Sequence, residues 1–218
     1  MVSSIDSTCI GVVIKHRKMN RNFLIIDCTG INDCIALFID NKFFTKKLQT
    51  FLTKYEVLVV EILEFIKKHN VKLDDKFSVI VNTGPGSFSG IRIALSTAKG
   101  MNLSKSINIF CYNNFLINAS LYLDKRKKII SIQKTSKNFY YMEILYDKKF
   151  THLNPKLLNS SKIQFENSLI VAPIEIKNDD DFLNFKILKI NYVENNLKNI
   201  SLLIDNNLLE NKLIKPLY

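Results

Sequence analysis

Glycine is scarce in this chain of 218 residues, which contains only six. Four of them fall in one stretch, Thr83 to Gly100, which reads TGPGSFSGIRIALSTAKG, and none follows Gly100. Glycine is needed where φ is positive or where the backbone must approach another group closely. The stretch therefore predicts a turn with a constrained backbone.

Histidine and arginine are rare too. The three histidines, His16, His69 and His152, are too scattered for a metal site or a catalytic triad. The net charge of +11 comes almost entirely from lysine, whereas arginine is the residue for bidentate recognition of phosphates and bases. Solvated lysines explain the charge most simply. A lysine surface that meets RNA or an acidic protein is the alternative.

The four cysteines form no C-x-x-C pair, so neither a disulfide framework nor a zinc site is expected. No apolar run reaches the length of a membrane span, and polar residues interrupt the N-terminus before a signal peptide could form. We therefore expect a cytoplasmic protein without a membrane partner. Residues 1–18 are predicted to be an extension, either outside the native chain or loosely attached to it, because Met19 precedes the first clear strand. An edge strand over Cys9 to Ile14 is the alternative.

The basic cluster Lys125-Arg126-Lys127-Lys128 marks a boundary between two predicted lobes, 19–124 and 125–218. The first is predicted to contain three antiparallel strands followed by alternating helices and strands. Its strands are 23–28, 33–39, 42–48, 77–81 and 107–111, and its helices are 53–69, 88–103 and 112–123. In the second, a hairpin over 128–133 and 138–146 precedes strands at 168–172 and 185–192, a short helix opened by Asp179, and a helix over 194–209. Residues 154–161 are expected to be a loop.

The glycine stretch matches none of the self-sufficient enzyme motifs. Gly84 and Gly90 are too far apart for a Walker A loop, which also needs Lys after its last glycine. The dinucleotide fingerprint fails because its last position is Ser89, and a nucleophile elbow fails because its centre is Phe88. The stretch is predicted to be a tight turn that leads into a helix, whose free N–H groups could still hold an anion. No catalytic and no metal-ligating residue is assigned.

The helix after the turn carries small residues every four positions: Gly90, Ala94 and Ala98. Such a stripe lets another element approach closely. Packing against the chain's own sheet and docking of a partner helix both remain open. The docking alternative assigns partner binding to Gly90, Ile91, Ala94, Leu95, Ala98 and Met101.

The same stretch resembles the signature of the TsaB family, also called YeaZ, whose typical form is GPGSFTG-[VIL]-R-[IV]-G-x-x-x-A-KG. The matching residues are Gly84, Pro85, Gly86, Ser87, Phe88, Gly90, Arg92, Ala98, Lys99 and Gly100. Asp27-Cys28-Thr29 is similar to the family's Asp-Thr-Ser segment, and Pro216-Leu217-Tyr218 to its Pro-x-Tyr tail. Where the family often has Asp-Ala-Arg in the second lobe, this chain has Ile132-Gln133-Lys134-Thr135.

The resemblance implies an α/β, actin-like (ASKHA, ribonuclease H-like) fold of two lobes, the second reduced. It also implies a non-catalytic subunit that pairs with a TsaD-like catalytic subunit and a TsaE-like ATPase. Together these support threonylcarbamoyladenosine modification of tRNA, which the chain would meet indirectly. No cofactor is expected for the chain alone, and ATP or ADP is left open for the interface with the partner. Self-association of the free chain is also left open.

Two other function classes compete with the accessory subunit. One is an enzyme: an autonomous actin-like ATPase or kinase, or a peptidase. The other is a tRNA-binding module that uses the lysine surface. An actin-like ATPase or kinase needs a glycine-containing phosphate loop in its second lobe, so the lack of glycine after Gly100 argues against the enzyme. The scarcity of arginine argues against the tRNA-binding module.

Overall fold

A computed structural model describes residues 22–30, 33–48, 57–123, 128–136, 138–159, 167–185, 187 and 189–210. The predicted extension 1–18, and the Thr53 to Glu56 part of the predicted first helix, lie outside them.

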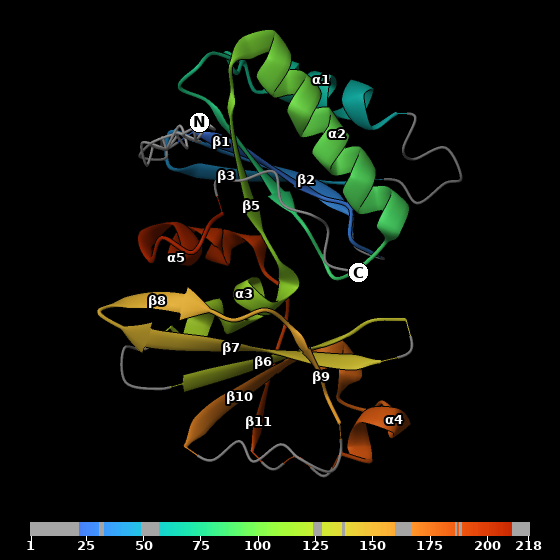
Figure 1. Cartoon of the computed structure of the whole chain (residues 1–218). Helices are drawn as coiled ribbons and strands as arrows, with labels where there is room; N and C mark the ends of the chain where they lie inside the picture. Colours follow the sequence, from blue (N-terminus) through green and yellow to red (C-terminus); the bar gives the residue numbers. More distant parts are fainter. Residues whose placement is uncertain are drawn as a thin grey trace, which may run out of the picture.

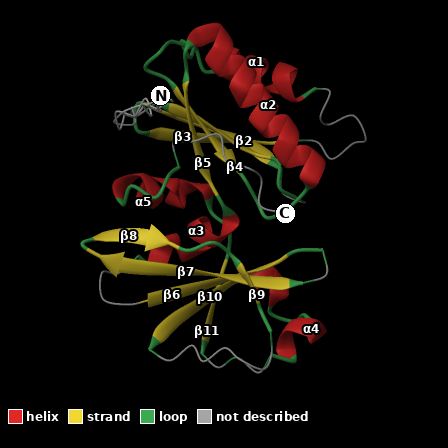
Figure 2. Ribbon diagram, in the orientation of Figure 1, coloured by secondary structure: helices red, strands yellow, loops and turns green. Residues whose placement is uncertain are grey.

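The first sheet has five strands in the order β3-β2-β1-β4-β5 (Figures 1 and 2). Its members are β1 (Phe23–Asp27), β2 (Cys34–Ile39), β3 (Lys42–Lys47), β4 (Ser78–Asn82) and β5 (Asn108–Tyr112). The first three form the predicted antiparallel meander, while β4 and β5 run parallel to β1. Every residue of β1 and β4 is buried, which explains their unbroken apolar runs, because strands covered on both faces need no polar alternation.

Two helices cover one face of this sheet, α1 (Leu58–Lys68) and α2 (Phe88–Lys105) (Figure 1). Their inward side chains pack on alternate residues of β1 and β4 to form the first hydrophobic core. Ser87 caps α2 by accepting a hydrogen bond from the N–H of Gly90 (3.3 Å). The predicted strand–turn–helix around the glycine stretch is thereby confirmed.

The opposite face of the first sheet packs on α3 (Asn114–Ala119) and α5 (Ile200–Asp205), which lie between the two sheets (Figure 1). The second hydrophobic core includes side chains of both sheets, for example Ile25 and Phe110 from the first, and Ile129 and Met142 from the second. The space between the two sheets is therefore filled by apolar side chains.

The second sheet has the order β11-β10-β6-β7-β8, with the short β9 paired to β7 (Figure 2). Its strands are β6 (Lys128–Lys134), β7 (Phe139–Asp147), β8 (Lys149–His152), β9 (Lys156–Leu157), β10 (Ser168–Pro173) and β11 (Ile190–Val193). A third core covers its outer face and includes Phe182 of α4 (Asp180–Leu183). The helices of this half are short, which fits the predicted reduced second lobe; the boundary at residue 124 stays a prediction.

Several predicted elements of the second half were wrong. The loop expected over 154–161 contains β9, and β8 was not predicted. The strand expected over 185–192 is confined to β11, and the helix expected over 194–209 is reduced to a 3-10 turn and α5. These elements are held by pairing and burial against the other strands rather than by their own periodicity. Within the part of the chain that the structure describes, no helix is long and apolar enough to cross a membrane.

Candidate functional site

A buried polar cluster lies where the three parallel strands of the first sheet end. Asp27 ends β1, Asn82 ends β4 and Tyr112 ends β5, so parallel strands bring these side chains to one edge. One carboxylate oxygen of Asp27 accepts from Asn82 Nδ2 (2.8 Å) and Tyr112 Oη (3.0 Å). The other accepts from the N–H (3.1 Å) and hydroxyl (2.7 Å) of Thr29. With four donors and 5% exposure, the carboxylate is fully engaged inside the protein.

The glycine turn is tied to this cluster. The N–H of Gly84, which has a φ of 98°, donates to Asn82 Oδ1 (2.9 Å). Gly86 lies so close to Thr29 that a Cβ would be 2.0 Å from the carbonyl oxygen of Thr29. The next N–H, that of Ser87, donates to that same oxygen (2.7 Å). The turn therefore needs glycine to let two loops touch, rather than to leave N–H groups open to a ligand.

Asn114 carries the same network toward the second sheet. Its backbone N–H donates to the carbonyl of Gly84 (2.7 Å), and its Nδ2 donates to that of Pro85 (2.8 Å). Its side-chain oxygen accepts from Asn82 (2.7 Å) and its carbonyl accepts from Nε2 of Gln133 in β6 (3.1 Å). One continuous set of hydrogen bonds thus joins the signature turn, the first sheet and the second sheet.

Two titratable groups at this edge, Tyr112 and Cys34, have raised pKa values. Burial, reinforced by nearby Asp27, raises the pKa of the Tyr112 phenol well above its usual value. Burial and the carboxylates of Asp27 and Asp33 raise the pKa of the Cys34 thiol to about 12, so it carries no thiolate at neutral pH. Across the described ranges, no group of three or more His, Cys, Asp or Glu could hold a metal ion.

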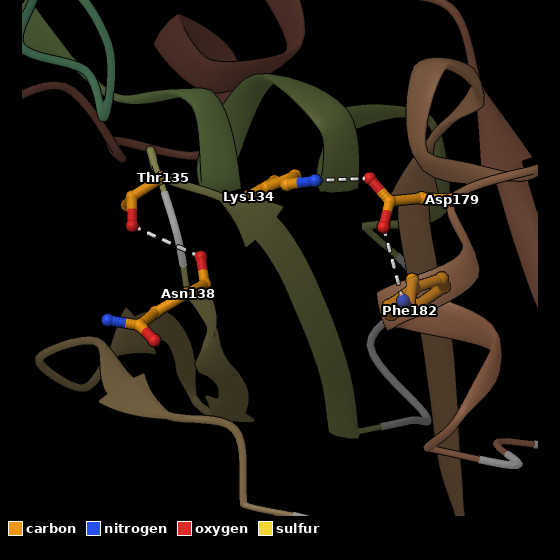
Figure 3. Close-up of polar contacts among 5 residues, drawn as sticks. All are labelled: Lys134, Thr135, Asn138, Asp179 and Phe182. Atoms are coloured by element: carbon orange, nitrogen blue, oxygen red, sulfur yellow. Dashed lines mark hydrogen bonds and ion pairs between the residues drawn. The ribbon is translucent and has the colours of Figure 1, made fainter.

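The second-lobe hairpin, where this chain departs from the family's Asp-Ala-Arg, is also internally satisfied (Figure 3). Lys134 forms an ion pair with Asp179, the residue that caps α4 through Phe182 N–H (3.2 Å). The turn is closed by the hydroxyl of Thr135, which donates to the carbonyl of Asn138 (3.1 Å). Asp179 holds the Lys134 ammonium, and the Lys134 hydrogen bond keeps the pKa of Asp179 below its ordinary value.

The predicted partner stripe on α2 requires a correction. Its members are buried against the chain's own sheet: Gly90, Ile91, Ala94, Leu95 and Ala98, with Met101 partly buried beside them. A buried residue cannot contact a partner without unfolding, so this stripe is a packing face, as the simpler alternative held. Two signature residues lie outside this core instead. Phe88 is 52% exposed, and the centroid of its ring lies 5.0 Å from the guanidinium carbon of exposed Arg92.

An apolar groove of about 490 Å³ lies between α1 and α2. From α1 it is lined by Val59, Ile62 and Leu63, and from α2 by Ser96, Thr97, Gly100, Met101, Ser104 and Lys105. Val59 is 49% exposed and Leu63 is 55% exposed. Exposed apolar side chains that line a hollow make this groove the candidate interaction surface of the described residues.

A second small-residue stripe, Ser96–Gly100–Ser104, lies along this groove and is exposed. A Cβ on Gly100 would have nothing within 4 Å, so the chain's own fold does not require glycine there. Glycine inside a helix costs about 1 kcal/mol relative to alanine. The cost is explained if another backbone approaches the helix at Gly100.

Comparisons with known proteins agree with the signature. The chain is 34% identical over 113 residues to the tRNA threonylcarbamoyladenosine biosynthesis protein TsaB of Buchnera aphidicola subsp. Baizongia pistaciae (strain Bp). The aligned part covers 48% of this chain and 51% of that protein, so the match spans about half the length of this curated relative. No protein-family model matches the chain.

Among solved structures, YeaZ from Pseudomonas aeruginosa is similar, with a TM-score of 0.62 and 11% identity over 84% of this chain and 90% of that one. A second structure, described as an uncharacterized protein with similarity to peptidase YEAZ from Pseudomonas aeruginosa, has a TM-score of 0.64 and 12% identity, with coverage of 90% and 98%. The chain is thus similar to a TsaB protein over about half of its sequence, and to YeaZ structures in its fold. The expected actin-like (ASKHA, ribonuclease H-like) fold is thereby confirmed.

Reading the sequence alone missed two parts of the site. The polar cluster could have been found from polar residues that end apolar parallel strands, as Asn82 and Tyr112 do. The groove could have been found from α1, whose sequence LVVEILEF holds more apolar residues than one buried face needs. Gly100, in the middle of a helix, was a third signal.

Proposed function

We propose that this chain is a non-catalytic subunit that pairs with a TsaD-type catalytic subunit. With a TsaE-type ATPase, the pair would modify tRNA beside the anticodon with a threonylcarbamoyl group. The chain itself would work in the cytoplasm as a scaffold or activator. The similarity to the Buchnera TsaB protein supports the pathway, and the fold supports the class of subunit.

The groove between α1 and α2 carries this proposal, because it gives the chain a surface for a protein partner. Exposed Val59 and Leu63 border a lane of small residues around Gly100. Ridges of a partner helix fit such a lane, since small side chains let two backbones come close. We assign partner binding to this groove, in place of the buried stripe Gly90–Ala94–Ala98.

The polar side chains of the cluster are already engaged in hydrogen bonds within the chain, which argues against an autonomous enzyme. Four donors occupy the Asp27 carboxylate, and Asp179 holds Lys134. The apolar core between the two sheets would have to open before a substrate could enter there. These contacts favour a rigid scaffold over an ATPase, kinase or peptidase, whose acid, base or phosphate-binding groups must reach a substrate.

A tRNA-binding module is the weaker alternative. Basic and acidic residues are nearly balanced over the described residues, so most of the net charge of +11 lies in segments outside them. The described residues therefore lack the excess of positive charge that neutralises a phosphate backbone. Contact with tRNA through the partner complex fits this distribution better.

Mixing the chain with the TsaD-type protein of the same cell tests the proposal. We expect a stable complex by size-exclusion chromatography with light scattering, and none for Leu63→Asp, which places a charge in the groove on an exposed position. The matched control is Val60→Asp, because Val60 is 53% exposed on the same helix and does not line the groove. Circular dichroism should show both variants folded.

Normal binding by folded Leu63→Asp would remove the groove from the proposal, and no complex with the wild-type chain would remove the proposal itself. Ala94→Arg is unsuitable here, since Ala94 is fully buried and a charge there would unfold the lobe. A dimer of the free chain that Leu63→Asp dissociates would show that the groove also serves self-association, which the proposal leaves open.

A further inference from the structure

We infer that the element of the partner that covers this face of α2 carries carboxylates, and that Arg92 anchors it. The inference rests on the proposed function and names the chemistry of the partner surface. It starts from the four exposed residues Phe88, Arg92, Lys99 and Leu103, spaced four, seven and four apart. At these spacings they form one stripe along α2, which we call the outer stripe.

The outer stripe is apolar at its ends and basic in between. Leu103 is 86% exposed, the highest value among the large hydrophobic residues of the described chain. The helix from Phe88 to Lys105 contains Arg92, Lys99 and Lys105 and no acidic residue at all. The acidic residues of α1, Glu61 and Glu64, are directed to Lys46 of β3 instead.

Arg92 differs from Lys99 and Lys105 because a neighbouring aromatic ring restricts its side chain. Its guanidinium lies over the Phe88 ring, a cation–π contact that restricts the side chain before any partner arrives. In the part of the chain that the structure describes, Arg92 is the single arginine, and no acidic side chain lies within ion-pair distance of it. A planar guanidinium kept in place by an exposed aromatic ring suits a bidentate carboxylate.

The groove and the outer stripe lie on either side of the exposed lane Ser96–Gly100–Ser104. A helix laid along that lane would set apolar residues over Leu63 and Leu103, and its flank would face Arg92 and Lys99. A flank with Asp or Glu neutralises these charges as they lose water, whereas a basic or apolar flank leaves them buried and unpaired. The occupant that fits is therefore an amphipathic helix with an acidic side.

Titration of the TsaD-type protein into variants of the full chain by calorimetry tests the inference. We expect Arg92→Glu to weaken binding by about tenfold or more, and Arg92→Lys or Phe88→Ala by less. Lys47→Glu, a charge reversal on exposed β3, is the matched control and should bind as the wild type does. Added NaCl should weaken wild-type binding and change Arg92→Glu binding much less. A partner variant in which the facing carboxylate is changed to Lys should bind Arg92→Glu again. Such a restoration would identify the carboxylate that pairs with Arg92.

Three results would overturn the inference. If folded Arg92→Glu binds the partner as the wild type does, while Leu63→Asp does not bind, Arg92 does not anchor an acidic element. The proposed function would remain intact. Equal losses of binding affinity in Arg92→Glu and Lys47→Glu would mean that only the net charge of the chain affects binding. Self-association tighter than binding to the partner would make a second copy, with the same basic stripe, the preferred occupant.

Discussion

The phenol of Tyr112 donates its hydrogen bond to Oδ2 of Asp27 (3.0 Å), although 85 residues separate them in sequence. Tyr112 ends β5 and Asp27 ends β1, with β4 between them. Both side chains are buried, and the phenol keeps its proton because burial and Asp27 raise its pKa. A carboxylate at the end of the first strand thus serves as the acceptor that holds three strands and the signature turn together.

Removing this donor tests the structural role. Tyr112→Phe keeps the ring and leaves the buried carboxylate one hydrogen bond short, so we expect a loss of about 1.5–3 kcal/mol in the free energy of unfolding. Urea denaturation followed by circular dichroism measures it. Tyr140→Phe, at a partly buried tyrosine in β7, is the control and should cost well under 1 kcal/mol. A cost for Tyr112→Phe as small as that of the control would mean that the cluster is not a structural clamp.

Two glycines of the signature, Gly86 in the turn and Gly100 in α2, should respond oppositely to alanine. Gly86→Ala places a Cβ 2.0 Å from the Thr29 carbonyl oxygen, so the turn must move and the chain should lose several kcal/mol. Gly100→Ala meets nothing within 4 Å and removes a helix-interior glycine, so the free chain should gain about 1 kcal/mol. Thermal unfolding of the isolated protein measures both changes. Destabilisation by Gly100→Ala would show that the fold itself needs this glycine.

The first half of the chain could be predicted well because its elements carry their own signals. The apolar runs of β1 and β4, the turn and α2 lie close to their predicted limits. In the second half, β8 and β9 have little hydrophobic pattern and exist because β7 offers them a pairing edge. Such long-range pairing cannot be read from a local window of sequence.

The partner-binding residues also could not be predicted from the sequence alone. The sequence reveals small residues every four positions along α2 but not which side of the helix meets the sheet. Gly90–Ala94–Ala98 and Ser96–Gly100–Ser104 have the same spacing, and only the structure separates the buried stripe from the exposed one. The apolar neighbours Ile91 and Leu95 favour burial of the stripe Gly90–Ala94–Ala98.

Acid should weaken the second sheet through Glu143 of β7. Hydrogen bonds and charges from Lys128 and Lys156 lower the pKa of Glu143 below its ordinary value. A carboxylate whose pKa is lower in the folded state contributes stability above its unfolded pKa, and that contribution disappears as pH falls through the folded pKa. Glu143→Gln should therefore be less stable than the wild type at pH 7, by about 1 kcal/mol or less. The difference should shrink toward zero in acid, as denaturation at pH 7 and near pH 3 would measure. A difference that does not depend on pH would mean that Glu143 acts through packing.

Nucleotide binding gives the sharpest separation between a scaffold and an enzyme. An actin-like ATPase needs groups in both lobes that can face the phosphates, but here four donors occupy Asp27 and Asp179 holds Lys134. We expect no saturable ATP binding and no hydrolysis by the isolated chain in calorimetry and phosphate-release assays. Binding should appear only when the TsaD-type partner is added, and folded Leu63→Asp should then abolish the chain's effect on it. Tight ATP binding with turnover by the chain alone would favour the autonomous enzyme and displace the scaffold.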